Sequence, residues 1–217
     1  TRMWNYASEA EAVRDALRLS RGMTYKNAIA GLNIGGGKAV IIGDARKIKN
    51  EALMRRFGRF VDSLGGRYWT AEDVNMSTKD MEFVRMETPY VAGMPVSMGG
   101  SGDPSPVTAY GVYMGMKAAA KKVYGSDSLE GKKVMVQGAG HVGTYLIGYL
   151  QKEKAQISIS DIFEDKIQQV TEQYKVTVVD PSKVYASDID IYAPCALGAT
   201  LNDETISQLN CTIVAGG

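Results

Sequence analysis

The arrangement of hydrophobic and polar residues differs between the two halves of this chain. In the second half, short apolar runs alternate with stretches whose apolar residues recur at helical spacing. This alternation is typical of parallel βαβ units, because consecutive parallel strands are joined by a crossover helix. We therefore expect a parallel sheet. Its predicted strands are 133–137, 156–160, 176–179, 189–193 and 211–215, and its predicted helices are 142–153, 163–174 and 202–209.

The first half predicts a less regular mixture of helices and strands. Ser8 is expected to begin a helix over 8–21, with Glu11 completing a capping box and Gly22 ending the helix. The chain as a whole is therefore expected to be α/β. The other elements predicted before the parallel sheet are strands at 28–33 and 39–43, a strand-like segment at 68–70, and helices at 50–64, 78–87 and 107–124.

Glycine and proline are concentrated between Gly93 and Pro106. Both residue types favour loops and turns, so this segment is expected to be a hinge and a domain boundary, with the hinge at about 93–106. We predict two α/β domains: residues 1–105, and residues 106–217 as a Rossmann domain with a doubly wound parallel sheet. The first and last residues are typical of positions inside a longer chain, so the second domain is expected to be truncated.

Composition narrows the classes of function. The 217 residues are 45% hydrophobic and carry a net charge of +1. This balance gives no reason to expect nucleic acid or an anionic membrane as a partner, and no apolar run approaches the roughly 20 residues of a membrane span. The two cysteines and single histidine lack metal-ligand spacing, so no metal is expected. The start has no signal-peptide pattern, and we expect a cytoplasmic protein.

A glycine-rich loop, Gly138–Gly143, lies between the predicted strand 133–137 and the helix that follows. Its GxGxxG spacing suits a tight turn whose backbone approaches a pyrophosphate at a helix N-terminus. Asp161, after the next predicted strand, would bind ribose hydroxyls and repel a 2′-phosphate, so NAD is favoured over NADP. The alternative is a tight turn that binds no nucleotide. The loop residues expected to contact the cofactor are Gly138, Ala139, Gly140, His141, Val142, Gly143 and Thr144.

Two residues near the carboxyl ends of the predicted strands are candidates for a chemical role. His141, the only histidine, is expected to face phosphate or solvent rather than to act as a catalyst. Cys195 follows the predicted strand 189–193, at the edge where the cofactor is expected. It is either a reactive thiol or a small buried lining residue, and the second interpretation is favoured.

Three glycines, Gly35–Gly37, precede Lys38 between two apolar runs. Bare backbone of this kind permits close approach of a ligand. A lysine desolvated beside it is expected to have a lowered pKa and to act, in its neutral form, as a base. Lys26, a second lysine upstream, and Asp73, which follows the aromatic segment 68–70, are further candidates for a functional role. The alternative interpretations are solvated surface lysines and a helix-capping aspartate.

These motifs together resemble the Glu/Leu/Phe/Val dehydrogenase family. The segments that carry the resemblance recur in the family's order and spacing, nearest to its leucine branch. The resemblance implies NAD-dependent oxidative deamination of a branched-chain L-amino acid (leucine, also valine and isoleucine) to its 2-oxo acid and ammonia. It also implies a first domain for substrate binding and oligomerisation, in a homo-oligomer such as an octamer. The segments are Thr24–Asn27, Gly35–Asp44, Thr70–Val74, Pro106–Ala109 and Ala193–Ala199.

The resemblance also implies roles for individual residues. Lys38 would activate the water that attacks an imino intermediate, Asp73 would exchange protons with the amino group, and Lys26 would bind the substrate carboxylate. The remaining implied contacts are those of Met23 and Ala71 with the substrate side chain, and those of Thr108, Cys195 and Ala196 with the cofactor.

Alternatives to this interpretation remain within the family and outside it. Met98–Ser101 is nearer to the phenylalanine branch. An aliphatic pocket separates substrates that differ by one methylene by only about 1–3 kcal/mol, so a phenylalanine or valine dehydrogenase is an alternative. From a different class, the chain would be a non-catalytic dinucleotide-binding module. The family also has segments before Thr1 and after Gly217 that contribute to its site.

Overall fold

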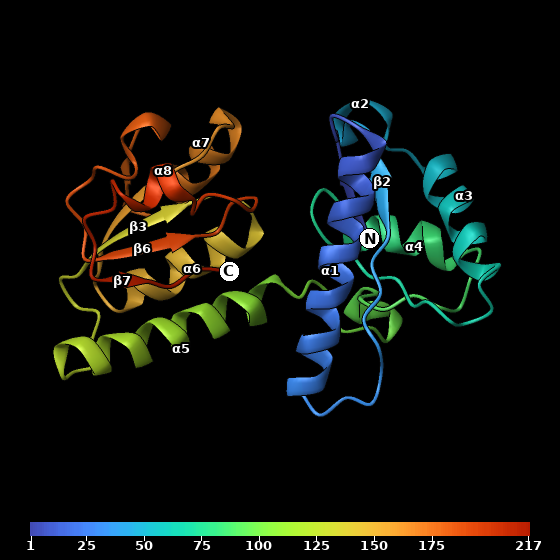
Figure 1. The fold of residues 1–217 in the computed structure, drawn as a ribbon, viewed down its shortest axis with the longest axis horizontal. Helices are drawn as coiled ribbons and strands as arrows, with labels where there is room; N and C mark the ends of the chain where they lie inside the picture. The colour runs from blue at the N-terminus through green and yellow to red at the C-terminus, as the bar shows by residue number, and fades with distance from the viewer. The chain divides into compact units, whose positions relative to one another are not determined.

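A computed structural model describes residues 1–217 as two compact units, Thr1–Pro104 and Ser105–Gly217 (Figure 1). The chain passes from one unit to the other within the segment that is rich in glycine and proline, which forms a loop with one 3₁₀ turn, η1 (Val96–Met98). No helix is long and apolar enough to cross a membrane. Both units combine helices with parallel strands, so the predicted α/β class is confirmed.

The second unit contains a five-stranded parallel sheet in the order β5-β4-β3-β6-β7. The first strand of the unit, β3, is central, and the chain winds outward from it in both directions. This is the arrangement of a Rossmann-type sheet, and ligands of such sheets bind beyond the carboxyl ends of the strands where the winding reverses, here β3 and β6. The strands are β3 (Lys133–Gln137), β4 (Gln156–Ser160), β5 (Thr177–Val178), β6 (Ile191–Pro194) and β7 (Ile213–Val214).

The central strand has a hydrophobic core on each side. Val134 and Val136 belong to one core, with residues of the α5 and α6 helices, whereas Met135 belongs to a second core with Tyr192. Successive side chains of a strand point to opposite faces, so a strand covered on both faces is a continuous apolar run. The helices of this unit are α5 (Ser105–Tyr124), α6 (His141–Lys152), α7 (Glu164–Gln173) and α8 (Asp203–Ile206), with a 3₁₀ turn η2 (Pro181–Lys183).

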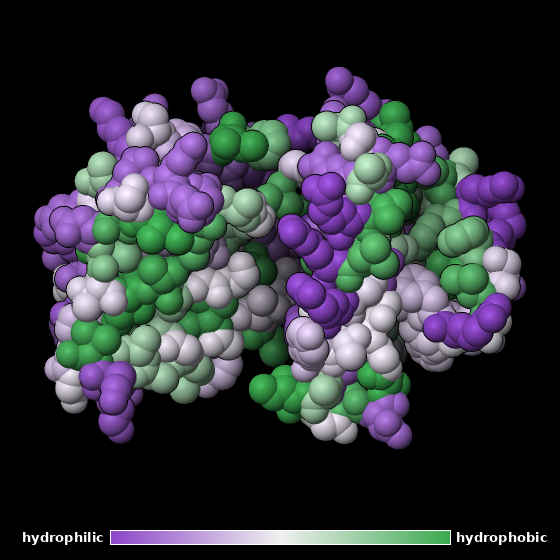
Figure 2. Space-filling view, in the orientation of Figure 1, coloured by the Kyte–Doolittle hydropathy of each residue, from purple (hydrophilic) through white to green (hydrophobic).

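The first unit is built on a two-stranded parallel sheet. Strand β1 (Arg2–Trp4) pairs with β2 (Val40–Ile42), and Arg2 lies opposite Val40. Methionines form much of the core beneath it, since Met3, Met54 and Met81 are fully buried. Apolar side chains also remain on the surface of this unit, as they do on that of the second unit (Figure 2). The helices of the first unit are α1 (Glu9–Ile29), α2 (Ala45–Ile48), α3 (Glu51–Asp62) and α4 (Thr78–Arg85).

Helix α1 corrects two predictions. Ser8 caps it as expected, accepting a hydrogen bond from the Glu11 N–H, but the helix passes through Gly22 and ends at Ile29. The strand predicted at 28–33 is therefore wrong. A glycine inside a helix costs about 1 kcal/mol relative to alanine, and tertiary hydrogen bonds from the last turns of α1 to the following loop oppose that cost.

Three other segments of the first unit differ from expectation. The strand-like segment 68–70 forms only a single bridge, from Thr70 to Val91. The short elements β1 and α2 were not predicted, because three or four residues carry no readable periodicity.

Candidate active site

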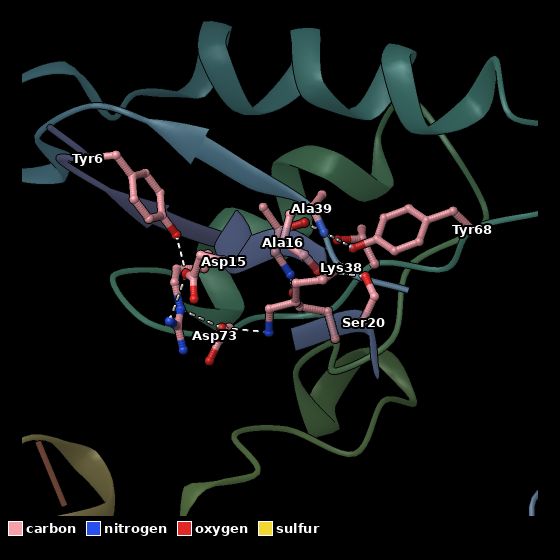
Figure 3. Close-up of polar contacts among 12 residues, drawn as sticks. Tyr6, Asp15, Ala16, Ser20, Lys38, Ala39, Tyr68 and Asp73 are labelled. Atoms are coloured by element: carbon pink, nitrogen blue, oxygen red, sulfur yellow. Dashed lines mark hydrogen bonds and ion pairs between the residues drawn. The ribbon is translucent and has the colours of Figure 1, made fainter. Parts of the chain in front are cut away.

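Lys38 and Asp73 form an ion pair at the start of β2 (Figure 3). The Lys38 Nζ atom lies 2.6 Å from Asp73 Oδ2, and the two side chains are 12% and 25% exposed. Lys38 comes from the end of the glycine-rich loop, and Asp73 from the loop that follows the Thr70 bridge. The structure thus brings together two residues that the sequence singled out separately.

The glycine-rich loop is held against helix α1. The Gly36 N–H donates to Thr24 Oγ1 at 3.1 Å, and Asn27 Nδ2 donates to the Gly35 carbonyl at 2.8 Å. A Cβ atom on Gly36 would lie 2.1 Å from the Ser20 carbonyl oxygen, whereas one on Gly35 would meet nothing within 4 Å. Gly36 is therefore required by the approach of the loop to α1, rather than by the approach of a ligand that the sequence analysis assumed.

Asp73 has a second cationic partner that the sequence analysis missed. Arg2 Nε donates to the same oxygen, Asp73 Oδ2, at 3.1 Å, and Arg2 Nη1 lies 3.2 Å from Asp15 Oδ2. Tyr6 Oη donates to Asp15 Oδ2 at 2.5 Å. These contacts form one connected polar network, from Tyr6 through Asp15, Arg2 and Asp73 to Lys38.

The surroundings of Asp73 keep it ionised. Burial by itself would raise the pKa of Asp73, but the hydrogen bond and charge of Lys38, and then the charge of Arg2, outweigh burial and hold this pKa below its usual value. A carboxylate that stays ionised accepts protons only from a stronger acid or a transiently acidic donor. In this site the nearest donor to it is the Lys38 ammonium group.

The neighbouring acid, Glu72, has the opposite electrostatics. Its Oε1 atom is buried and has no hydrogen-bond partner. Burial, followed by the negative charges of Asp103 and Asp80, raises the pKa of Glu72 to about 7. Two adjacent carboxyl groups therefore differ at neutral pH, because Asp73 is paired with cations whereas Glu72 is buried without a partner and faces anions.

The structure leaves the other predicted substrate residues outside this network. Lys26 lies in the last turn of α1, exposed, and its ammonium group makes no ion pair. The cation expected to lie beside Lys38 is thus replaced by the carboxylate of Asp73. Met23 and Ala71 are half-buried, and no hydrogen bond or ion pair joins their side chains to Lys38 or Asp73.

In the second unit, the predicted glycine loop joins β3 to α6. Gly138 has φ +106°, which other residues rarely adopt, and a Cβ atom there would lie 2.6 Å from the Cys195 carbonyl oxygen. A Cβ atom on Gly143 would lie 1.9 Å from the Gly138 carbonyl oxygen. These two glycines are therefore required by the turn itself.

Gly140 serves a different purpose in this loop. It is the N-cap of α6, no side chain caps the helix there, and a Cβ atom on Gly140 would meet nothing within 4 Å. The first N–H groups of a helix lack intrahelical partners and bind anions well. An uncapped helix start with open space beside it fits the pyrophosphate of a dinucleotide.

Asp161 lies beside this loop, at the end of β4. Its Oδ2 atom accepts from the Ala139 N–H at 2.7 Å and its Oδ1 atom from the Phe163 N–H at 2.9 Å. An ionised carboxylate has about four acceptor positions, so these bonds leave positions for ribose hydroxyls. The carboxylate is thereby fixed next to the uncapped start of α6.

The other residues predicted to contact the cofactor lie near the same edge. Cys195 follows β6, and its N–H donates to the Gln137 carbonyl oxygen at 2.7 Å. Burial raises the pKa of the Cys195 thiol, which opposes thiolate formation and favours the lining interpretation over a reactive thiol. Two further residues of this group, Ala196 and His141, are exposed. The Thr144 Oγ1 atom donates to the Ala139 carbonyl oxygen at 3.4 Å. The last two residues, Thr108 and Val142, have methyl groups near Gly217.

The structure contains no group of three or more histidine, cysteine, aspartate or glutamate side chains that could hold a metal ion. Both cysteines, Cys195 and Cys211, are free thiols. The polar site of the first unit therefore consists of charged side chains. That of the second unit consists mainly of backbone N–H groups.

The fold and these sites first define the class of protein. It is an α/β protein in which a Rossmann-type unit follows a unit that carries a lysine–aspartate pair. Comparison with known proteins then gives the family. Residues 1–90 match the model of the "Glu/Leu/Phe/Val dehydrogenase, dimerisation domain", and residues 99–165 match that of "Glutamate/Leucine/Phenylalanine/Valine dehydrogenase". The chain belongs to the Glu/Leu/Phe/Val dehydrogenase family, as its motifs predicted.

Individual relatives are similar over the whole of this chain. It is 56% identical to the leucine dehydrogenase of Bacillus subtilis, over 100% of this chain and 59% of that protein. It is 48% identical to the valine dehydrogenase of Streptomyces coelicolor, over 100% and 60%. The solved structure of L-tryptophan dehydrogenase from Nostoc punctiforme superposes with a TM-score of 0.68 at 44% identity, over 100% of this chain and 60% of that one. The chain thus spans about three fifths of the length of these relatives.

Proposed function

We propose that this chain is the portion of an NAD-dependent L-amino acid dehydrogenase that holds its catalytic pair and nucleotide loop. The reaction is oxidative deamination of a branched-chain L-amino acid, leucine and also valine or isoleucine, to its 2-oxo acid and ammonia. The observation that carries the proposal is the Lys38–Asp73 ion pair at 2.6 Å. The same chain also has a glycine loop that leads into the uncapped N-terminus of α6, beside Asp161. The leucine and valine dehydrogenases among its relatives support this substrate class.

The pair supplies the proton transfers that deamination needs. The substrate ammonium must lose one proton before a hydride can leave Cα to give an iminium, and a water must then attack the imino carbon. In our proposal, Asp73 exchanges protons with the substrate nitrogen and Lys38 activates the water. Their contact lets a proton pass directly between the lysine nitrogen and the carboxylate. Lys26 binds the substrate carboxylate, which its exposed ammonium group can do as a point charge.

The chemistry that bound NAD would supply is the acceptance of the hydride from Cα. The chain's contribution is to hold the pyrophosphate on the uncapped N-terminus of α6 and the ribose on Asp161. The carboxylate of Asp161 would repel a 2′-phosphate, so NAD is proposed rather than NADP. Calorimetric titration of the chain with both nucleotides tests this directly. We expect NAD to bind more tightly, and equal binding of the two in the wild type would contradict the role of Asp161.

The substrate side chain is proposed to contact Met23 and Ala71. A panel of L-leucine, L-valine, L-isoleucine and L-phenylalanine, assayed for NADH formation, tests the choice through kcat/KM. We expect the three aliphatic substrates to lie within roughly 10–200-fold of one another. A preference for phenylalanine would favour the other branch of the family. NAD binding without turnover of any amino acid would favour a non-catalytic dinucleotide-binding module.

We also propose that the protein is a cytoplasmic homo-oligomer, with an octamer as one candidate assembly. The description of the family model over residues 1–90 as a dimerisation domain supports self-association of the first unit. Light scattering coupled to size exclusion gives the mass directly. A monomer at micromolar concentration would contradict this part of the proposal.

A further inference from the structure

The carboxylate of Asp73 is shared between two cations. Lys38 Nζ lies 2.6 Å from Asp73 Oδ2, and Arg2 Nε donates to the same oxygen at 3.1 Å. The Arg2 side chain is only 18% exposed, so its charge is poorly screened by solvent. The proposed chemistry uses Lys38 and Asp73 and leaves Arg2 without a role.

Arg2 is fixed from both its backbone and its side chain. It lies opposite Val40 in the β1–β2 sheet, and its N–H donates to the Ala39 carbonyl at 3.1 Å, so its backbone runs beside the residue that follows Lys38. At the other end, Nη1 lies 3.2 Å from Asp15 Oδ2. Asp15 is held in turn by Tyr6 Oη at 2.5 Å (Figure 3).

The two cations differ in what they can do. Lysine can release its proton, whereas the arginine guanidinium stays charged and its fork of N–H donors has a fixed geometry. If Asp73 faced Lys38 alone, it would lose its counter-charge and keep only a weaker, uncharged donor whenever Lys38 became neutral. With Arg2 in place, one donor and one positive charge remain on the same oxygen throughout.

We propose that Arg2 is a positioning residue that keeps Asp73 ionised and aimed at Lys38 in both proton states of the lysine, and that Asp15 and Tyr6 hold Arg2 in that place. Its catalytic consequence rests on the function proposed above. The charged side chains that face Asp73 are those of Lys38 and Arg2, and the third titratable group there is the amino group of Thr1, whose pKa burial lowers to about 5, so that it is neutral at pH 7. Of the two side chains among them, only Arg2 cannot change its charge.

The first test follows the titration of Asp73 by NMR of labelled aspartate carboxyl carbons in the 217-residue chain, without substrate. Arg2→Gln should move the Asp73 titration to higher pH, because a nearby positive charge is lost. Arg2→Lys should keep most of the wild-type titration. The matched control is Arg55→Gln in the same unit, where Arg55 Nε donates to Glu87 at 2.6 Å outside this network. It should leave Asp73 unchanged.

The second test measures turnover. Arg2→Gln should lower kcat by up to about 100-fold, the loss that a misplacement of about 1 Å can cause, with little change in KM. It should also move the acidic limb of the pH profile to higher pH, and Asp15→Asn should do the same to a smaller extent. An Asp73 titration in Arg2→Gln that matches the wild type would overturn the proposal, whether or not the chain turns over.

The two tests separate the proposals. A shifted Asp73 titration in a protein whose full-length form has no amino acid dehydrogenase activity would leave the role of Arg2 intact and contradict the proposed function alone. If Arg2→Gln fails to fold, Asp15→Asn provides a smaller titration shift in the same direction, through the loss of the group that holds Arg2. An unshifted titration in a folded Asp15→Asn chain would then count against the network.

Discussion

The two units build their polar sites in opposite ways. In the first unit, charged side chains from distant parts of the chain meet, as when Arg2 reaches Asp73 across 71 positions. In the second unit, one contiguous loop, Gly138–Gly143, presents backbone N–H groups, and Asp161 supports it through a backbone hydrogen bond. Proton chemistry and nucleotide binding should therefore fail separately. Substitutions in the first site should change protonation and rate, whereas those in the second should change affinity.

The largest expected effect comes from Asp73→Asn. This change keeps the size of the side chain but removes the negative charge that Lys38 and Arg2 share. We expect kcat for L-leucine to fall roughly 10²–10⁴-fold, the usual contribution of a positioned acid or base. NAD affinity, measured by calorimetry, should stay within about twofold. A comparable loss of NAD affinity would break the separation between the two sites.

The next effect, on affinity, comes from Gly143→Ala. Its Cβ atom would lie 1.9 Å from the Gly138 carbonyl oxygen, so the loop must move. We expect NAD binding to weaken at least about tenfold, or about 1.4 kcal/mol. Gly35→Ala is the matched control, because a Cβ atom there meets nothing within 4 Å. Tight NAD binding by Gly143→Ala would show that the turn is not what orients the N–H groups.

The smallest expected effect is on stability and belongs to the first unit alone. The folded-state pKa of Glu72, about 7, lies above its ordinary value of 4.5. The folded state therefore binds the proton more tightly, and this group makes stability fall as pH rises from about 4.5 to about 7. Glu72→Gln should remove that part of the pH dependence and make the first unit more stable than the wild type at about pH 8.

Tryptophan fluorescence during urea unfolding measures the stability of the first unit. The two tryptophans, Trp4 and Trp69, both lie in the first unit, so their signal reports on that unit and not on the Rossmann unit. The difference between Glu72→Gln and the wild type should vanish at acidic pH, below about 4.5. An equal difference at all pH values would mean that the carboxyl group does not titrate as its surroundings indicate.

The same difference between the two sites explains which of their residues could be predicted from the sequence. Strands β3 and β4 and the loop Gly138–Gly143 were predicted at their observed positions, because each is a local pattern of apolar residues and glycines. Asp161 followed from its place at the end of β4. For a site built from contiguous backbone, local periodicity and spacing are sufficient.

The first site was predicted only in part. Lys38 and Asp73 were found through their motifs, but Arg2, Asp15 and Tyr6 carry no local signal, since their roles depend on side chains that meet through the fold. The predicted end of α1 at Gly22 failed for a related reason. Thr24 and Asn27 bond to Gly36 and Gly35, and these tertiary contacts oppose the local preference of a glycine.

In the proposed function, Lys38, paired with Asp73, is the base of an NAD-dependent amino acid dehydrogenase. NADH formation from L-leucine and NAD tests this role, measured for the full-length protein as wild type and as Lys38→Ala, with Lys47→Ala, an exposed lysine of the same unit, as control. We expect turnover by the wild type and by Lys47→Ala, and a loss of roughly 10²–10⁴-fold in Lys38→Ala at unchanged NAD affinity. Wild-type turnover by Lys38→Ala would contradict the role of Lys38 as the base.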